Sequence, residues 1–159
     1  VKWWRLAAEQ GNALAQYNLG VMYANGDGVL EDDKEAVKWY RLAAEQGFAE
    51  AQYNLGVMYA NGDGVPEDDK EAVKWWRLAA EQGLALAQYN LGLMYANGDG
   101  VPEDDAYAYA WWNIASSSGH VDARRSKGIW AGEMTKEQIA EAQKLSKELM
   151  RKIEANSSD

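Results

Sequence analysis

One short segment contains the residue types of a hydrolase. His120 is the only histidine of the chain, and it lies beside the serines at 116–118 and beside Asp122. A Ser-His-Asp hydrolase of this kind holds its serine on a sharp strand-to-helix turn between glycines. Here Gly119 follows a helical pattern, and no glycine-rich elbow surrounds a serine. We therefore interpret these residues as structural and predict that the chain is not an enzyme.

Acidic residues recur in three loops and raise the question of a metal site. Read from Asn61 against the calcium-binding helix–loop–helix template, the second loop has Pro66 where the template needs Gly and Ala72 where it needs Glu. The loops fail this test, and the chain has no cysteine. We predict no metal and no cofactor, and expect turn and capping roles with weak attraction for cations or basic partners. The acidic positions are Asp27, 31–33, Asp63, 67–69, Asp99 and 103–105.

A tyrosine, an asparagine and an aliphatic residue recur together in three segments. Asn is a poor residue for a helix interior, so its recurrence needs a reason. The amides could clamp the backbone of an extended peptide, or they could make hydrogen bonds between repeats, because Asn readily satisfies nearby backbone groups. Both interpretations stay open. The nine candidate binding residues are Tyr17, Asn18, Val21, Tyr53, Asn54, Val57, Tyr89, Asn90 and Leu93.

Pairs of aromatic residues recur as well and could form a platform for a carbohydrate or another ligand. Each pair after the first follows an alanine by three and four residues, which places all three side chains on one face of a helix. This spacing favours a buried core over a ligand platform. The pairs are Trp3-Trp4, Trp39-Tyr40, Trp75-Trp76 and Trp111-Trp112, and the alanines are Ala36, Ala72 and Ala108.

All of these side chains belong to a unit that recurs every 36 residues. Residues 36–71 match residues 72–107 at 30 of 36 positions. A period of this length is typical of stacked helical or strand repeats rather than of a fold around one centre. We predict a single repeat domain over 1–159, with an orphan second helix at 1–11 and repeats at 12–47, 48–83 and 84–119.

Each repeat is expected to contain two helices joined by a turn. In residues 48–83 the first helix ends in the Gly-containing turn at 61–64, where Gly accepts a left-handed backbone. Asp68 and Glu71 have the spacing of a capping box, in which Asp68 accepts from the first N–H groups and Glu71 reaches back. The second helix then carries one apolar stripe, formed by Ala72, Trp75, Trp76, Ala79 and Ala80.

A glycine lies inside the predicted first helix of every repeat, at Gly20, Gly56 and Gly92. Within a helix Gly costs about 1 kcal/mol relative to Ala. Burial of an aromatic ring contributes about 2–3 kcal/mol, which exceeds this cost. We therefore expect a ring of the paired helix, such as Tyr40 or Trp76, to lie over the bare backbone.

The pattern changes after Gly119. Arg124 and Arg125 replace the Gln-Tyr pair, and Thr135 with Gln138 forms another capping box before an amphipathic helix. Terminal repeats of such proteins are atypical because their outer face meets water. We predict a C-terminal cap at 120–155 and a disordered tail at 156–159.

Composition narrows the class of partner and leaves the location open. The net charge of −9 disfavours nucleic-acid binding, which needs a basic surface over phosphates. No run of about 18 apolar residues predicts a membrane span. Because Val1 falls in the middle of a repeat, we expect the sequence to be a fragment or a processed product. Cytoplasmic, periplasmic and secreted locations all stay open, as does the oligomeric state.

The repeat closely resembles the Sel-1-like repeat family, over residues 1–119. That family has a small residue before a Leu-Gly pair, then a Tyr, G-x-G-V, an Asp and A-x-x-W-Y-x-x-A-A-x-x-G. The segment at 134–143 and the Trp-Trp-Asn at 111–113 are similar to the family's terminal module. In the second repeat the matching residues are Ala51, Leu55-Gly56, Tyr59, Gly62, Gly64-Val65, Asp69, Ala72, Trp75-Trp76, Ala79-Ala80 and Gly83.

The resemblance implies an all-α, right-handed α/α superhelix, a solenoid similar to tetratricopeptide repeats, that acts as an adaptor between proteins. In such repeats the first helix lines the concave side, where the nine candidate residues would hold a peptide or a partner helix. One alternative is a small-ligand or β-lactam hydrolase, as suspected for cysteine-rich relatives, which the lack of Cys disfavours. Another is a consensus-like repeat protein without a partner.

Overall fold

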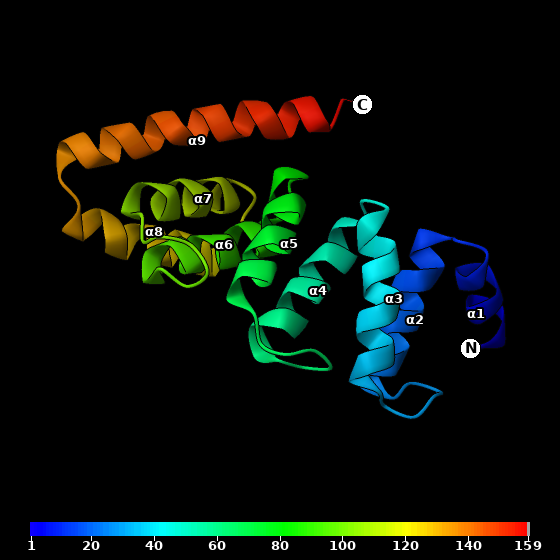
Figure 1. Ribbon diagram of the computed structural model, residues 1–159. Coiled ribbons are helices and arrows are strands. Elements are labelled where there is room, and N and C mark those ends of the chain that lie inside the picture. The colour runs from blue at the N-terminus through cyan, green and yellow to red at the C-terminus, as the bar shows by residue number, and fades with distance from the viewer. Residues whose placement is uncertain (159) are drawn as a thin grey trace. The chain divides into compact units, whose positions relative to one another are not determined.

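The protein is built from helices alone. The computed structural model describes residues 1–158, and these contain nine helices and no strand, which confirms the all-α class (Figure 1). Three first helices (α2, α4 and α6) alternate with three second helices (α3, α5 and α7), as the 36-residue period predicts. The bounds are α1 Lys2–Glu9, α2 Ala13–Asn25, α3 Asp33–Glu45, α4 Ala49–Asn61, α5 Asp69–Glu81, α6 Ala85–Asn97, α7 Asp105–Ser117, α8 Val121–Glu133 and α9 Lys136–Asn156.

The helices gather into two compact units. In the first unit, residues 1–75, α1 packs on α2, α2 on α3, and α3 on α4. In the second unit, which begins at Trp76, α6 packs on α7, and α7 also contacts α8 and α9. Figure 1 shows the loop that joins the members of each pair, such as α2 and α3 or α6 and α7.

The turn between paired helices follows the predicted chemistry at its start. Gly26, Gly62 and Gly98 end the first helices with φ of 72°, 73° and 73°, which is the left-handed conformation. This backbone suits Gly because it has no Cβ to clash with the neighbouring carbonyl. The prediction that a glycine closes each first helix is confirmed.

The capping box predicted at the second helices is wrong in one half. Asp68 Oδ1 does accept from the Glu71 N–H, at 3.1 Å. The second bond of the box, from the Asp68 N–H to the Glu71 carboxylate, does not form, because the Asp68 N–H donates to the Tyr59 carbonyl at 2.9 Å. The Glu71 carboxylate instead lies 3.6 Å from Lys74 Nζ. The same backbone bond joins Asp32 to Tyr23 and Asp104 to Tyr95, so it fixes each turn against the end of its first helix.

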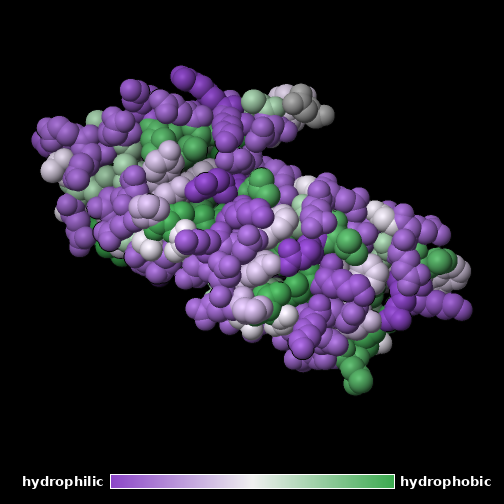
Figure 2. Space-filling view, viewed as in Figure 1, coloured by the Kyte–Doolittle hydropathy of each residue, from purple (hydrophilic) through white to green (hydrophobic). Residues whose placement is uncertain are grey.

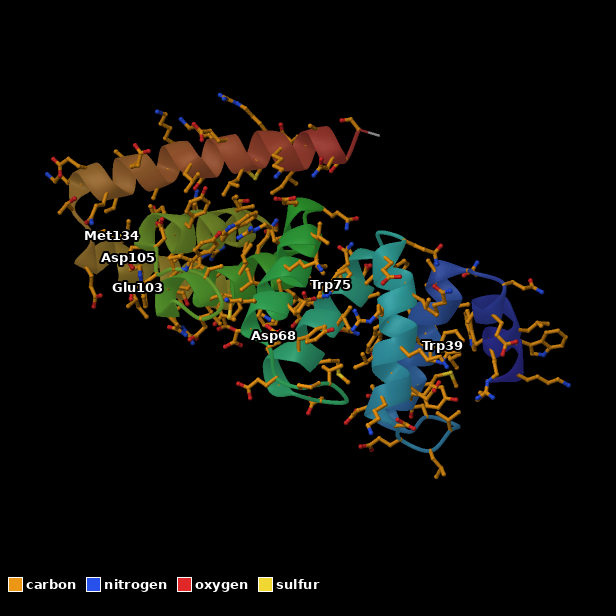
Figure 3. All side chains as sticks on the ribbon, viewed as in Figure 1. Trp39, Asp68, Trp75, Glu103, Asp105 and Met134 are labelled. Carbon is orange, nitrogen blue, oxygen red and sulfur yellow. The ribbon has the colours of Figure 1, made fainter. Side chains whose placement is uncertain are left out.

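The paired aromatic residues form the core of the repeats, as their spacing predicts. Trp39, Trp75 and Trp111 are buried, and so are the residues that follow them, Tyr40, Trp76 and Trp112. Figure 3 labels Trp39 and Trp75 among the packed side chains of the first unit. The core interpretation is wrong for Trp3 and Trp4, which are exposed on α1.

Two of the helical glycines lie directly beneath a ring of the paired helix. A Cβ built on Gly20 would stand 2.6 Å from Tyr40 Cδ1, and one on Gly92 would overlap the indole of Trp112. The Trp112 Nε1–H also donates to the Tyr89 carbonyl at 3.1 Å, which holds the ring across the first helix. The expected close approach is therefore confirmed at Gly20 and Gly92.

Identical polar contacts join successive repeats. α1, α3 and α5 each supply an arginine whose guanidinium donates to a tyrosine hydroxyl of the first helix that follows. The same pair of helices is joined by a buried glutamine whose Nε2 donates to an alanine carbonyl at 3.1 Å. The arginine pairs are Arg5–Tyr23, Arg41–Tyr59 and Arg77–Tyr95. The glutamine pairs are Gln16–Ala8, Gln52–Ala44 and Gln88–Ala80.

The last of these glutamines lacks one bond that the first one makes. Gln16 Oε1 accepts from Gln46 Nε2 at 2.7 Å. Gln88 Oε1 is buried and has no hydrogen-bond partner among the described residues. The residue in register with Gln46 is Ser118, whose side chain is too short to reach it. A buried acceptor left unpaired costs about 1–3 kcal/mol.

Ser118→Gln should therefore stabilise the protein, by about 0.5–1.5 kcal/mol, because the longer side chain supplies the missing donor. Urea denaturation of the two proteins measures the change. Gln46→Ser is the matched control, since it removes the equivalent bond from Gln16 and should destabilise by about 1 kcal/mol. A Ser118→Gln variant no more stable than the wild type would contradict this account of Gln88.

The C-terminal helix begins as predicted and extends further than predicted. Thr135 and Gln138 form both bonds of the predicted capping box. α9 then continues through Asn156, so the prediction of a disordered tail from residue 156 is wrong there, while Asp159 lies outside the described residues. The helix persists because Lys152 Nζ lies 2.7 Å from the Glu81 carboxylate and Asn156 Nδ2 donates to the Glu81 carbonyl at 3.1 Å.

Candidate functional site

The nine candidate binding residues lie on first helices and keep part of their surface after packing. We call them the strip residues. Tyr17, Asn18 and Val21 of α2, with Tyr53, Asn54 and Val57 of α4, belong to the first unit, and Tyr89, Asn90 and Leu93 of α6 to the second. All nine are partly buried. By contrast, Leu19, Leu55 and Leu91, on the core face of the same helices, are fully buried.

In the first unit an aromatic side chain outside the prediction joins the strip residues. The rings of Tyr17 and Phe48 lie 5.1 Å apart, and those of Tyr17 and Tyr40 lie 6.1 Å apart. Phe48 is the N-cap residue of α4, and its ring therefore reaches back to the helix of the preceding repeat. Sequence reasoning missed Phe48 because its position comes before the helical pattern.

Tyr40 has an unusual environment beside these rings. Burial raises the pKa of Tyr40 to about 12, and a polar contact with the Asn54 side chain only partly opposes this effect. The hydroxyl therefore stays protonated at neutral pH. Because Asn54 belongs to the repeat after Tyr40, this contact is of the inter-repeat kind. It gives Asn54 a structural task in the first unit.

Asn18 and Asn90 differ from Asn54. Their side-chain amides have no hydrogen-bond partner within residues 1–158, and both are partly accessible. An amide offers two N–H donors and one carbonyl acceptor, which match the C=O and N–H groups of a peptide backbone. These two asparagines therefore have the capacity for an external ligand.

In the second unit His120 takes the place that Phe48 holds in the first. Its ring stacks on Tyr89 at 4.7 Å, and its Nδ1 accepts from the Ala123 N–H at 3.2 Å as the N-cap of α8. One signal could have identified both residues, because the N-cap position differs in every repeat, as Asn12, Phe48, Leu84 and His120.

Ser117 and Asp122, near His120, are engaged elsewhere. Ser117 Oγ donates to the Ile114 carbonyl at 2.6 Å, within its own helix. Asp122 Oδ1 lies 3.7 Å from Arg125 Nη1. Ser117, His120 and Asp122 therefore have three separate partners and do not act on one another as a nucleophile, a base and its orienting carboxylate. A hydrolytic triad needs a base within hydrogen-bond reach of its nucleophile.

The acidic loops have structural partners as well. Asn61 Nδ2 donates to Asp63 at 3.2 Å, and Asn25 makes the same bond to Asp27. No group of three or more His, Cys, Asp or Glu residues in 1–158 could hold a metal ion. Figure 2 shows hydrophilic side chains over most of the visible face. Across the same residues, every helix is too short or too polar to cross a membrane.

Comparisons with known proteins agree with the repeat pattern. The Sel1 repeat profile matches residues 1–12, 13–48, 49–84 and 85–120. A crystal structure of a Sel1 repeat protein from Oxalobacter formigenes is 40% identical over 76% of this chain, with a TM-score of 0.74. A protective antigen, c5321, present in uropathogenic Escherichia coli strains and displaying an SLR fold is 32% identical over 98% of this chain, with a TM-score of 0.75.

The matches cover most of this chain but only part of each relative. The chain spans 50% of the Oxalobacter protein and 41% of the Escherichia coli antigen. A search of curated proteins finds no significant match. The repeat profile nevertheless covers most of the chain without gaps, and both solved structures share its fold. The chain belongs to the Sel1 repeat family.

Proposed function

We propose that the protein is an interaction scaffold that binds an extended peptide or a partner helix on the strip residues of its first helices. Sel1 repeat proteins generally serve as protein-interaction scaffolds. This chain contributes a specific feature to that role. Its strip residues stay partly accessible on α2, α4 and α6, whereas Leu19, Leu55 and Leu91 on the same helices are buried in the core.

The chemistry of the strip suits a peptide more than a small metabolite. Tyr17 with Phe48, and Tyr89 with His120, form aromatic pairs on which an apolar side chain could pack. Asn18 and Asn90 have free amides beside these pairs. Apolar contact and backbone hydrogen bonds alternate along an extended peptide, which is the usual way that such segments are recognised. On this proposal the strip residues recognise a protein partner without a cofactor.

Catalysis and nucleic-acid binding are less well supported. Ser117, His120 and Asp122 are occupied by three different partners, which speaks against hydrolysis. The net charge of −9 would repel phosphates. A chromogenic β-lactam assay on the purified chain provides a direct check of the hydrolytic alternative, and we expect no turnover.

Removal of the two free amides should weaken peptide binding. We expect Asn18→Ala with Asn90→Ala to reduce affinity by about tenfold or more, because each lost hydrogen bond is worth about 0.5–1.5 kcal/mol. The measurement uses peptides selected from a random phage-displayed library on the wild-type chain, followed by calorimetric titration. Asn54 is left intact because its contact with Tyr40 would confound binding with stability.

A second double variant controls for the chemical change itself. Asn25→Ala with Asn97→Ala also removes two helical asparagines, but from the exposed C-terminal ends of α2 and α6. This control should bind the selected peptides like the wild type. Unchanged affinity of the Asn18 and Asn90 variant, with its helix content intact, would refute the clamp.

A further inference from the structure

A cavity lies between α7 and α9. The two helices pack on each other in the second unit (Figure 1), and the cavity between them has a volume of about 530 Å³. Small-molecule sites in proteins measure about 300–1,000 Å³, so this space can hold a ligand. The α9 residues that line it recur every three or four positions from Gln143 to Glu154, and they therefore form one face of that helix.

The sequence of α7 departs from the repeat at the wall of this cavity. Asn113 and Ser117 stand where both α3 and α5 have an arginine and a glutamate. The exchange of two long charged side chains for two short neutral ones removes side-chain volume from this surface. Ile114, which also lines the cavity, is 3% exposed, whereas Leu42, in register on α3, is 38% exposed. α7 therefore contributes a buried apolar surface with short polar side chains on either side of it.

α9 brings two cations to the cavity, and neither has a partner in the described part of the chain. Lys147 and Arg151 are exposed, lie one helical turn apart, and make no ion pair or hydrogen bond with another residue of 1–158. Like charges at this spacing repel each other. Lys152 of the same helix differs, because its Nζ lies 2.7 Å from the Glu81 carboxylate. Glu154 is the one carboxylate among the lining residues, so the cavity keeps a positive charge in a chain of net charge −9.

Asn113 adds a neutral donor beside these cations. Its Oδ1 accepts from Lys127 Nζ at 3.1 Å, which leaves the amide NH₂ group available to a ligand. The two serines that line the cavity supply no donor, because each hydroxyl donates to a carbonyl of its own helix. The free donors of the cavity are therefore ammonium, guanidinium and amide N–H groups, which together favour an anion.

We propose that this cavity binds a small organic anion, a carboxylate that carries a short aliphatic chain. The carboxylate accepts from Lys147, Arg151 and the Asn113 NH₂ group, and a guanidinium can hold both of its oxygens at once. The chain packs on Ile114 and on Met150, whose flexible thioether adapts to irregular shapes. A neutral lipid would leave the cations unpaired, and an inorganic anion would leave the apolar wall in water. The strip residues take no part, so this inference is independent of the proposed function.

Octanoate is the probe for this site, and octanol and acetate are its two partial analogues. Titration of octanoate into the isotope-labelled protein, followed by two-dimensional NMR, should shift backbone amide signals of α7 and α9. We expect a dissociation constant of about 10 μM to 1 mM. Octanol lacks the charge and acetate lacks the chain, so each should bind more weakly than octanoate by about tenfold or more.

Removal of the two cations should weaken octanoate binding. Lys147→Gln with Arg151→Gln should raise the dissociation constant by about tenfold or more, because both charged donors are lost. Lys136→Gln with Lys144→Gln is the matched control, since it removes two exposed charges of α9 that do not line the cavity. The control should bind octanoate like the wild type. All four side chains are exposed, so both variants should keep the helix content of the wild type.

A third variant tests the space on α7. Ser117→Glu restores the residue that α3 and α5 have in register, and it returns a carboxylate to the cavity. This variant should fold and should no longer bind octanoate. The proposal is overturned if octanol binds as tightly as octanoate, if the variant without Lys147 and Arg151 keeps the wild-type affinity, if Ser117→Glu still binds octanoate, or if the shifted signals lie outside α7 and α9.

Discussion

Gly64→Ala is expected to destabilise the protein by about 2–4 kcal/mol, which is among the largest effects that one added methyl group can have here. Gly64 has φ of +69°, and a left-handed residue with a Cβ costs about 1–2 kcal/mol. In addition, the new Cβ would overlap the Asp33 carbonyl and stand 2.9 Å from the Lys34 nitrogen. These are backbone atoms at the start of α3, and they cannot move without disturbing that helix.

The matched control is Gly28→Ala, in the preceding loop. Gly28 has nearly the same φ, +73°, but its nearest neighbour would be the Val1 side chain at 3.1 Å. It should therefore show the backbone cost of about 1–2 kcal/mol with little else. Urea denaturation of both variants separates the cost of the left-handed backbone from the cost of the overlap with α3. If Gly64→Ala and Gly28→Ala lower the free energy of unfolding equally, the close approach of Gly64 to α3 does not contribute to stability.

Gly92→Ala is expected to destabilise by about 1–3 kcal/mol, although Ala is the better helix former. The Cβ would occupy the place of the Trp112 indole, which is fully buried and held by its bond to the Tyr89 carbonyl. Displacement of a buried ring costs more than the gain of about 1 kcal/mol that Ala brings to a helix.

Gly128→Ala makes the same change at the same place in a repeat, where no ring lies above it. At this position only the higher helix propensity of Ala matters, and we expect a gain in stability of about 0.5–1 kcal/mol. The two variants should therefore shift the urea midpoint in opposite directions. A gain of stability in both would show that Trp112 adjusts freely and that the close packing of α6 on α7 is unimportant.

The confirmed predictions concern interactions between residues that are close along the chain and that recur in each repeat. The period identifies two helices per repeat, Gly62 ends the first of them, and Asp68 caps the second. Such signals can be read from the sequence because the residue and its partner are close along the chain. The glycine beneath a ring at Gly92 could be predicted too, since only a close neighbour explains a glycine in that helix.

The errors concern residues whose partners lie further away. The capping-box spacing predicts that Glu71 accepts from the Asp68 N–H, but that N–H donates to the Tyr59 carbonyl of the other helix. The sequence predicts a disordered tail from Asn156, but Asn156 Nδ2 donates to the Glu81 carbonyl. The rings of Phe48 and His120 contact tyrosines of the preceding repeats, which are also distant along the chain. Sequence periodicity describes each helix well and says little about contacts between them.

The arginine–tyrosine and glutamine–alanine contacts have a consequence for how such a protein can change its length. At the α1–α2, α3–α4 and α5–α6 junctions the same donor meets the same acceptor, as in Arg41–Tyr59 and Arg77–Tyr95. A repeat inserted or lost by unequal recombination leaves a junction that keeps the arginine–tyrosine and glutamine–alanine bonds. Length can therefore vary by whole repeats without loss of these bonds, whose removal would leave buried polar groups unpaired. The number of repeats can then change while the polar contacts of these junctions stay the same.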